Sequence, residues 1–172
     1  METKSKIEYI VRDVRKPVGD GHKYVIHCCN NFGRMGAGVA RALMEKWPAV
    51  RERYIQWSLQ QGGLRLGDIQ VVNVEDSVAV VNMIGQHGIR YADDGTPPIR
   101  YDAMRACLNE VYELAKTDGT DMEDASVHVP YLCGCALAGG EWNIVESLLQ
   151  ECLADKGIRV VVYDIFNQRE NS

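Results

Sequence analysis

The chain has 172 residues, of which 46% are apolar and 25% charged, and its formal net charge is −5. This balance predicts one globular domain over residues 1–172 and argues against a broad basic surface for nucleic acid. No segment reaches the roughly 18 consecutive apolar residues of a membrane span, and the first residues lack the apolar stretch of a secretory signal. We therefore expect a cytoplasmic protein that does not contact membranes.

In chain order, alternating residues predict a strand over 7–11, and the apolar run 23–28 predicts a more central one. Helical spacing follows over residues 36–61, in two pieces because Pro48 removes a backbone donor. Residues 69–73 and 77–83 read as strands.

After a loop over residues 87–98, apolar spacing predicts a helix over 99–114, then a strand over 125–132. Another helix is expected over 142–153, followed by a strand over 158–163. Strands that alternate with helices favour an α/β fold with a mixed, largely parallel sheet.

Two glycine-rich turns each follow a predicted strand and precede a helix. The first glycine turn covers residues 33–38 and the second covers residues 134–140. Glycine allows close approach to the backbone, and a helix start presents unpaired N–H groups, so such turns suit phosphate oxygens. Neither turn has the GxGxxG spacing of a dinucleotide site or the Lys-Ser/Thr pair of a P-loop. We expect the two turns to converge at the carboxyl ends of neighbouring strands.

The six cysteines have neither a disulfide-scaffold pattern nor a CxxC zinc spacing. We interpret them as buried thiols, and we expect no metal or other cofactor. Cys28 or Cys135 is not expected to act as a nucleophile, because the sequence offers no convincing paired base.

Four segments together resemble the macrodomain family of ADP-ribose-binding modules, in particular its bacterial and phage-type Appr-1-p processing branch. They are VIHCCNNFGRMGAGVARAL, AVVNMIGQHGI, PPIRYDAMRACL and VHVPYLCGCALAGGEW. The resemblance follows the family's order across nearly the whole chain. It implies a three-layer α/β/α fold around a mixed six-stranded sheet, with a cleft for ADP-ribose.

Position by position, the resemblance implies a ligand site. Asp13, followed by Val14, would accept a hydrogen bond from the adenine amine, although a solvated turn acid is an equal alternative. Asn30 would meet the distal ribose. Main-chain N–H groups of two segments would hold the diphosphate. The first segment is Gly36, Ala37, Gly38 and Val39, and the second is Cys135, Ala136, Leu137, Ala138 and Gly139.

The chain departs from the family pattern at four positions. Asn31 replaces an aspartate that is frequent in relatives, which removes a possible carboxylate base. Ala136 replaces a glycine, at a cost of about 1 kcal/mol or more if that position needs a positive φ. Gln86 and Ala138 stand where some hydrolases of the family have a lysine and an aspartate, so a covalent lysyl intermediate is not expected.

The remaining candidates for chemistry are polar residues at predicted strand ends. His27 or His87 would act as general base near neutral pH, with Asn30 and Asn31 as further catalytic candidates. The structural alternative for His27 is a hydrogen-bonded core histidine. Arg100 would bind phosphate, and its alternative is a solvent-facing side chain at a helix start.

These residues lead to the hypothesis that the protein binds ADP-ribose and hydrolyses a substituent on its distal ribose, namely the phosphate of ADP-ribose 1″-phosphate. One alternative is an ADP-ribosyl or O-acetyl-ADP-ribose hydrolase. Another is a reader that binds ADP-ribose or an ADP-ribosylated macromolecule without turnover.

Overall fold

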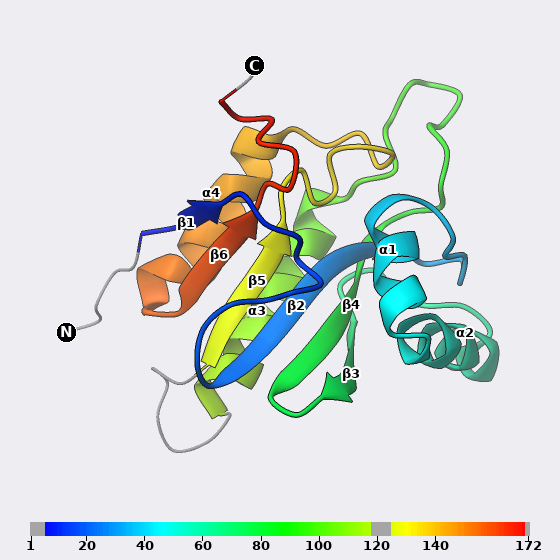
Figure 1. Cartoon of the computed structure of the whole chain (residues 1–172). Helices are drawn as coiled ribbons and strands as arrows, with labels where there is room; N and C mark the ends of the chain where they lie inside the picture. Colours follow the sequence, from blue (N-terminus) through cyan, green and yellow to red (C-terminus); the bar gives the residue numbers. More distant parts are fainter. Residues whose placement is uncertain (1–5, 118–124, 171–172) are drawn as a thin grey trace.

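The computed structural model describes residues 6–117 and 125–170, which form a six-stranded sheet, four α-helices and one short 3₁₀ helix (Figure 1). In chain order the elements are β1 (Glu8–Ile10), β2 (His22–Asn30), α1 (Gly38–Lys46), α2 (Ala49–Gln61), β3 (Ile69–Glu75), β4 (Val78–Gln86), α3 (Tyr101–Thr117), β5 (Ala125–Pro130), α4 (Trp142–Cys152), η2 (Ala154–Lys156) and β6 (Arg159–Tyr163).

The strand order in the sheet is β1-β6-β5-β2-β4-β3. All neighbouring strands are parallel except β3, which runs antiparallel to β4. The predicted mixed, largely parallel sheet is therefore confirmed. Parallel strands end at the same edge of a sheet, so the turns that follow β2, β4 and β5 lie together.

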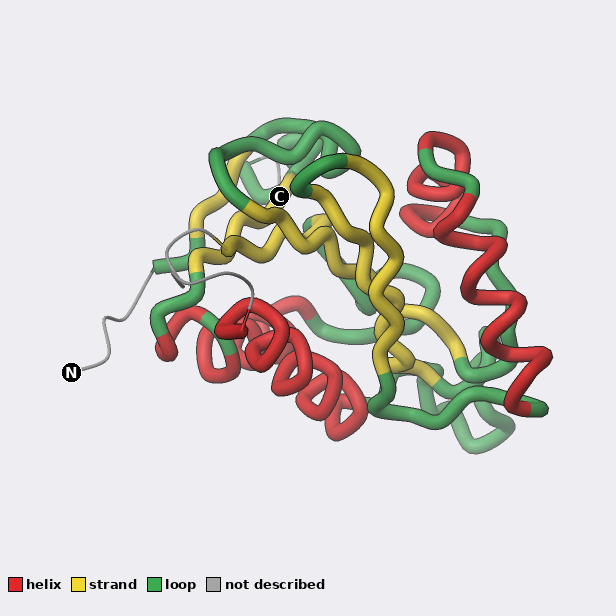
Figure 2. Tube along the Cα trace, turned by 90° about the horizontal axis from the view of Figure 1, so that it is seen from below, coloured by secondary structure: helices red, strands yellow, loops and turns green. Residues whose placement is uncertain are grey.

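The helices cover both faces of the sheet and make three layers, as the resemblance implied (Figure 2). One core lies between the sheet and the pair α3 and α4, and includes Met104, Leu108 and Leu149. On the other face, Leu43 of α1 and Val50 of α2 pack against the sheet. Because both faces are covered, β4 reads as a nearly continuous apolar run rather than an alternating one.

The predicted elements are all present, with differences at their ends. Pro48 separates α1 from α2, as expected. Helix α3 begins at Tyr101 rather than at residue 99, because the Ile99 amide donates to the Ala138 carbonyl over 3.0 Å and residue 99 bridges Gln86. The contact ties the loop before α3 to the second glycine turn.

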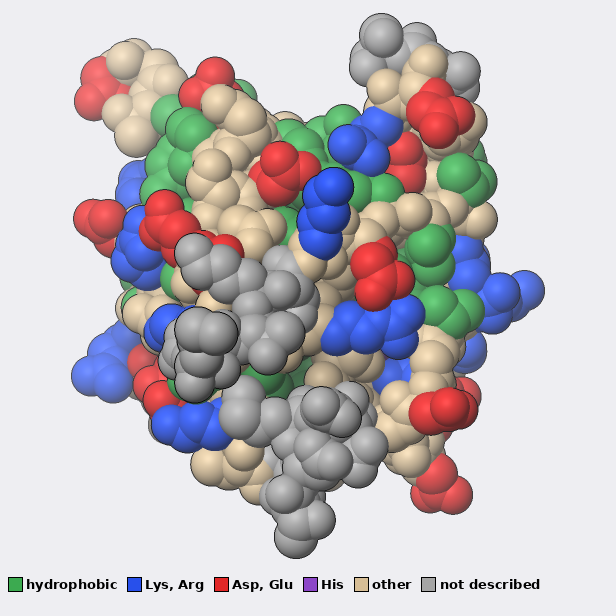
Figure 3. Space-filling model, turned by 90° about the vertical axis from the view of Figure 1, so that its left-hand side faces the viewer, with side chains coloured by type: hydrophobic (Ala, Val, Ile, Leu, Met, Phe, Trp, Pro, Cys, Tyr) green, Lys and Arg blue, Asp and Glu red, His purple; other side chains and the backbone are tan. Residues whose placement is uncertain are grey.

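Acidic and basic side chains are interspersed on the face shown in Figure 3, in keeping with the modest net charge. In the part of the chain that the structure describes, no helix is long and apolar enough to cross a membrane.

A buried hydrogen-bond chain joins the last two strands to the loop after β1. The Val18 amide donates to the Tyr163 hydroxyl over 2.9 Å, and this hydroxyl lies 2.6 Å from Nδ1 of His128. On the other side of the ring, Nε2 lies 2.8 Å from the Ser126 hydroxyl. His128 is fully buried, and burial lowers its pKa to about 3.

Two buried histidines make the protein sensitive to acid. Burial also lowers the pKa of His27, to about 4. The unfolded chain has ordinary histidines with a pKa near 6.5, so it binds more protons than the folded chain below that pH. Stability is full above about pH 6.5 and is lost as the pH falls toward the folded values.

We therefore expect the free energy of unfolding to fall by about 1 kcal/mol per pH unit for each of these histidines between pH 6.5 and pH 5. Denaturant unfolding at several pH values measures this slope. His128→Gln should remove about half of it. Equal stability at pH 7 and pH 5 would contradict the prediction.

Candidate functional site

A pocket of about 540 Å³ opens at the carboxyl ends of β2, β4 and β5. Its floor is formed by the end of β2 with Gln86 and Pro130. Its walls come from the two glycine turns and their flanking residues, with Ile89 added by the loop after β4. The sequence separates the two turns by about a hundred positions. The wall residues are Arg34, Met35, Gly36, Ala37, Gly38, Val39, Ala40, Ile89, Leu132, Cys133, Gly134, Ala136, Leu137 and Ala138.

The first wall ends in the N-terminus of α1. This helix begins at Gly38, and its N-cap residue Ala37 has no side-chain oxygen to accept the first N–H groups. A helix N-terminus without such a cap carries unpaired donors and the positive end of the helix dipole. Ala37, Gly38 and Val39 all line the pocket, so these donors suit an anionic group placed there.

The second wall offers a row of main-chain donors. The Cys135 amide donates to the Leu132 carbonyl over 2.8 Å, and the Gly139 amide donates to the Ala136 carbonyl over 3.2 Å. Between them, the amides of Ala136, Leu137 and Ala138 donate to no backbone carbonyl of the described residues. Successive free N–H groups of this kind form a concave site for anions.

Backbone strain lies at Leu132 and not at Ala136. Leu132 has a φ of +67°, a left-handed conformation that is costly for a leucine, and it lines the pocket. Ala136 is absent from the positive-φ residues of the described chain. The alanine in place of the family's glycine therefore carries no left-handed strain.

Asn30 organises the first glycine turn through its side chain. Its Oδ1 accepts from the amides of Phe32 and Arg34 over 3.0 and 3.2 Å. The Tyr54 hydroxyl lies 2.5 Å from the main-chain carbonyl oxygen of Asn30 and 3.0 Å from Oδ1. Nδ2 of Asn30 donates to the Arg34 carbonyl over 2.6 Å. One N–H of the amide is left for a ligand hydroxyl, so Asn30 both shapes the wall and lines the pocket.

His27 lies in the floor, in a buried polar contact. Its Nε2 is 2.5 Å from Oδ1 of Asn82, and only 2% of the residue is exposed. Asn82 in turn donates to the Val50 carbonyl and to the Gln70 side chain. These contacts give His27 the structural role named as its alternative. Its lowered pKa makes the ring a weaker base, and a catalytic role stays a prediction.

Asn31, Gln86 and His87 meet at one end of the pocket. Nδ2 of Asn31 lies 3.0 Å from Nδ1 of His87, just outside the lining. Gln86 does line the pocket, and Nε2 of its side chain donates to the Gly88 carbonyl over 3.0 Å.

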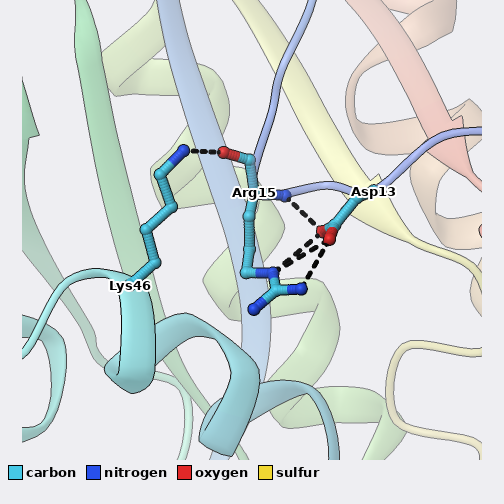
Figure 4. Close-up of polar contacts among 3 residues, drawn as sticks. All are labelled: Asp13, Arg15 and Lys46. Carbon is cyan, nitrogen blue, oxygen red and sulfur yellow. Dashed lines mark hydrogen bonds and ion pairs between the residues drawn. The ribbon is translucent and has the colours of Figure 1, made fainter.

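Asp13 and Val14 lie outside the lining of this pocket. Figure 4 shows the Arg15 guanidinium against the Asp13 carboxylate, with a shortest distance of 2.7 Å, and Lys46 of α1 contacting the Arg15 carbonyl. Hydrogen bonds from Arg15 lower the pKa of Asp13. Val14 is buried in the core under α1 and α2. The adenine contact expected for this segment stays a prediction.

Arg100 also lies outside the lining. Its Nη1 donates to the carbonyls of Pro97, Pro98 and Ile99 over 2.6, 3.0 and 3.1 Å. These bonds hold the turn that leads into α3, a structural task that neither interpretation of the sequence foresaw.

Cys135 and Gly139 belong to the second glycine turn but do not line the pocket. A Cβ at Gly139 would lie 2.8 Å from Cβ of Pro97 and would collide with the Tyr91 hydroxyl. Burial raises the pKa of Cys135 to about 11 and that of Cys133 to about 12. Thiols that remain protonated at neutral pH make poor nucleophiles.

Two residues of interest were missed from the sequence. Arg34 is one of them: among the described residues that line the pocket, it alone carries a carboxylate, ammonium or guanidinium group. Phe166 is 74% exposed and follows β6 by three residues, two after Asp164, whose amide donates to the carbonyl of Ile10 in β1. An aromatic residue just after a valine-rich strand was the available signal, but the strand order β1-β6-β5 was needed to interpret it.

Comparison with solved structures identifies the fold. A protein of unknown function from Bacteroides thetaiotaomicron is 46% identical with a TM-score of 0.87, over 93% of this chain and 98% of that chain. A macrodomain protein from Streptomyces coelicolor is 37% identical with a TM-score of 0.78, over 92% of this chain and 99% of that chain. The chain belongs to the macrodomain family.

More distant proteins are also similar to this chain. Thermosipho africanus DarTG in complex with ADP-ribose is 19% identical with a TM-score of 0.65, over 81% of this chain and 37% of that chain. Mouse chromodomain-helicase-DNA-binding protein 1-like is 26% identical over 167 residues. The match covers 92% of this chain but only 18% of the mouse protein's length. A scan against models of protein families finds no match.

The packing at Gly139 gives a testable prediction. Gly139→Ala should lower the free energy of unfolding by at least about 1 kcal/mol more than Gly95→Ala. Both glycines have positive φ values, +76° and +87°, but nothing lies within 4 Å of a Cβ at Gly95. Denaturant unfolding measures both losses: Gly95→Ala adds only backbone strain, whereas Gly139→Ala adds the same strain and a steric clash. Equal losses would mean that the loop over residues 87–98 moves away from the new Cβ at no measurable cost.

Proposed function

We propose that this macrodomain binds ADP-ribose in the pocket between the two glycine turns. The observation that carries the proposal is the pair of facing donor sets, from the start of α1 and from residues 136–138, on one pocket. A diphosphate offers oxygens in two adjacent groups and so satisfies both sets at once. The volume of about 540 Å³ lies within the usual range for small-ligand sites.

The strand order, together with the position that the family resemblance gives Asp13, supports one orientation of the ligand. The adenosine would extend past β5 toward the ends of β6 and β1, where exposed Phe166 offers a ring face and Asp13 a carboxylate. The distal ribose would lie at the other end, where Asn30 keeps one free N–H and Gln86 lines the floor. The ADP-ribose complex of the similar Thermosipho structure supports this class of ligand.

The proposed reaction is hydrolysis of ADP-ribose 1″-phosphate. A water would attack the phosphorus, its oxygen forming the new P–O bond while the bond to the C1″ oxygen breaks. One proton of the water would pass to the C1″ oxygen, which leaves inorganic phosphate and ADP-ribose. The chain's contribution would be to fix the ester beside Asn30 and Gln86, which lowers the entropic part of the barrier. The lining described above offers no lysine for a covalent intermediate.

A reader without turnover is the second candidate, and the chemistry of the lining favours it. Among the described lining residues there is no Asp, Glu or Lys, and His27 is held in the core by Asn82. Such a pocket has strong means of binding and few of proton transfer. An ADP-ribosylated macromolecule would then be the partner.

A charge placed in the second wall tests binding. Ala136→Asp should weaken ADP-ribose binding at least about tenfold, because a carboxylate beside the diphosphate repels it. Ala136→Asn adds a side chain of nearly the same size as aspartate but without its charge, and it should change the affinity by less than about threefold. Isothermal titration calorimetry measures both. If the two variants bind alike, the diphosphate does not sit at residues 136–138.

A panel of substrates separates the enzyme from the reader. We expect phosphate release from ADP-ribose 1″-phosphate, followed with a phosphate-specific colour assay, at a rate proportional to protein concentration. O-acetyl-ADP-ribose and an ADP-ribosylated peptide test the other hydrolases. ADP-ribose binding with no turnover of any of the three would establish the reader instead.

A further inference from the structure

A polar and aromatic rim, made of Asn31, Phe32 and His87, borders the pocket. None of the three lines the pocket itself, but His87 stands between two lining residues, Gln86 and Ile89, and Asn31 follows the lining residue Asn30. His87 is exposed, and its ring meets the Phe32 ring edge-on at 5.2 Å between centroids. The rim borders the place of the distal ribose if the ligand lies as proposed above.

The orientation of the Asn31 amide is fixed by the backbone. The Gly88 amide donates to Oδ1 of Asn31 over 2.9 Å. A main-chain N–H can only donate, so the oxygen of the Asn31 side chain must face Gly88. The nitrogen Nδ2 then faces His87, where it lies 3.0 Å from Nδ1.

This arrangement selects one tautomer of His87. The Nδ2 group of asparagine has two donors and no acceptor, so Nδ1 of His87 must accept the hydrogen bond. The proton of the neutral ring therefore sits on Nε2, the nitrogen not engaged by Asn31. An imidazole in this state offers a donor at Nε2 and no lone pair there, which argues against its role as general base through that atom.

We propose that Asn31 is a positioning residue that holds His87 as the Nε2–H tautomer, and that this donor binds an anionic oxygen of the substituent on the distal ribose. The proposal rests on the proposed function for the position of the ribose, but the tautomer does not. A fixed donor binds the charged oxygens of a phosphate ester more strongly than the neutral hydroxyl oxygen of ADP-ribose.

The tautomer is tested in the protein without ligand. The ¹⁵N spectrum of the imidazole rings at pH 8, with His87 assigned by its loss in His87→Gln, should show the proton of His87 on Nε2. In Asn31→Asp the carboxylate only accepts, so the proton should move to Nδ1. Asn73→Asp adds the same charge at an exposed position of β3 and should leave the wild-type tautomer. A wild-type proton on Nδ1 would overturn the proposal.

Selectivity is tested with two ligands, ADP-ribose and a non-hydrolysable 1″-phosphonate analogue of its phosphate ester. His87→Ala should weaken binding of the analogue about tenfold, the usual effect of one hydrogen bond to a charged group, and change that of ADP-ribose by less than about twofold. His87→Gln, which keeps a donor, should recover part of the loss.

The outcomes separate the two claims. Wild-type protein that binds neither ligand refutes the proposed function and this role with it. Normal binding of ADP-ribose, combined with an equal effect of His87→Ala on both ligands or with no effect on either, overturns the role of His87 and leaves ADP-ribose binding intact.

Discussion

Unpaired main-chain N–H groups at one edge of a parallel sheet are the constraint on which this site depends. In the described residues, three main-chain amides of the second glycine turn and the first amides of α1 donate to no backbone carbonyl, and no side chain caps α1. Most of the residues that carry these donors are exposed, among them Ala37, Gly38, Ala136 and Leu137, so the N–H groups are open to a ligand. The two turns face each other because β2 and β5 run parallel and end together. A ligand with two adjacent anionic groups satisfies both at once.

The conformation of the first wall depends on one side chain. The Asn30 side chain closes the turn by accepting from the amides of Phe32 and Arg34 and donating to the Arg34 carbonyl. The hydroxyl of Tyr54 in α2 donates to the Asn30 main-chain carbonyl. Helix α2 is thereby linked to the pocket, although none of its residues lines it. Replacement of Asn30 would alter the wall itself, so its effect on a ligand includes a change in backbone geometry.

Dipoles, more than charges, make this pocket attractive to anions. Its thiols have raised pKa values, His27 is a weak base, and Arg34 is the one charged side chain in the described lining. Backbone donors in fixed positions need little reorganisation, which suits recognition of a particular arrangement of oxygens. Chemistry beyond binding would depend on the distal rim, where the Asn31 amide determines which nitrogen of His87 carries its proton.

The sequence determined the elements, the α/β class and the two glycine turns, because apolar periodicity and glycine placement act over a few neighbouring residues. The family resemblance predicted that Asn30 and the turns form one ligand site, and Asn30 does line one pocket with residues of both turns. Tertiary structure decided what each polar side chain does: Arg100 binds carbonyls at the start of α3, His27 binds Asn82, and Asn31 faces His87. Asn82 and His87 lie 55 and 56 positions from His27 and Asn31 in the sequence, whereas the carbonyls that Arg100 binds belong to its own neighbours. Hydrogen bonds require atoms within about 3 Å, and only the folded chain brings the first two pairs to that range.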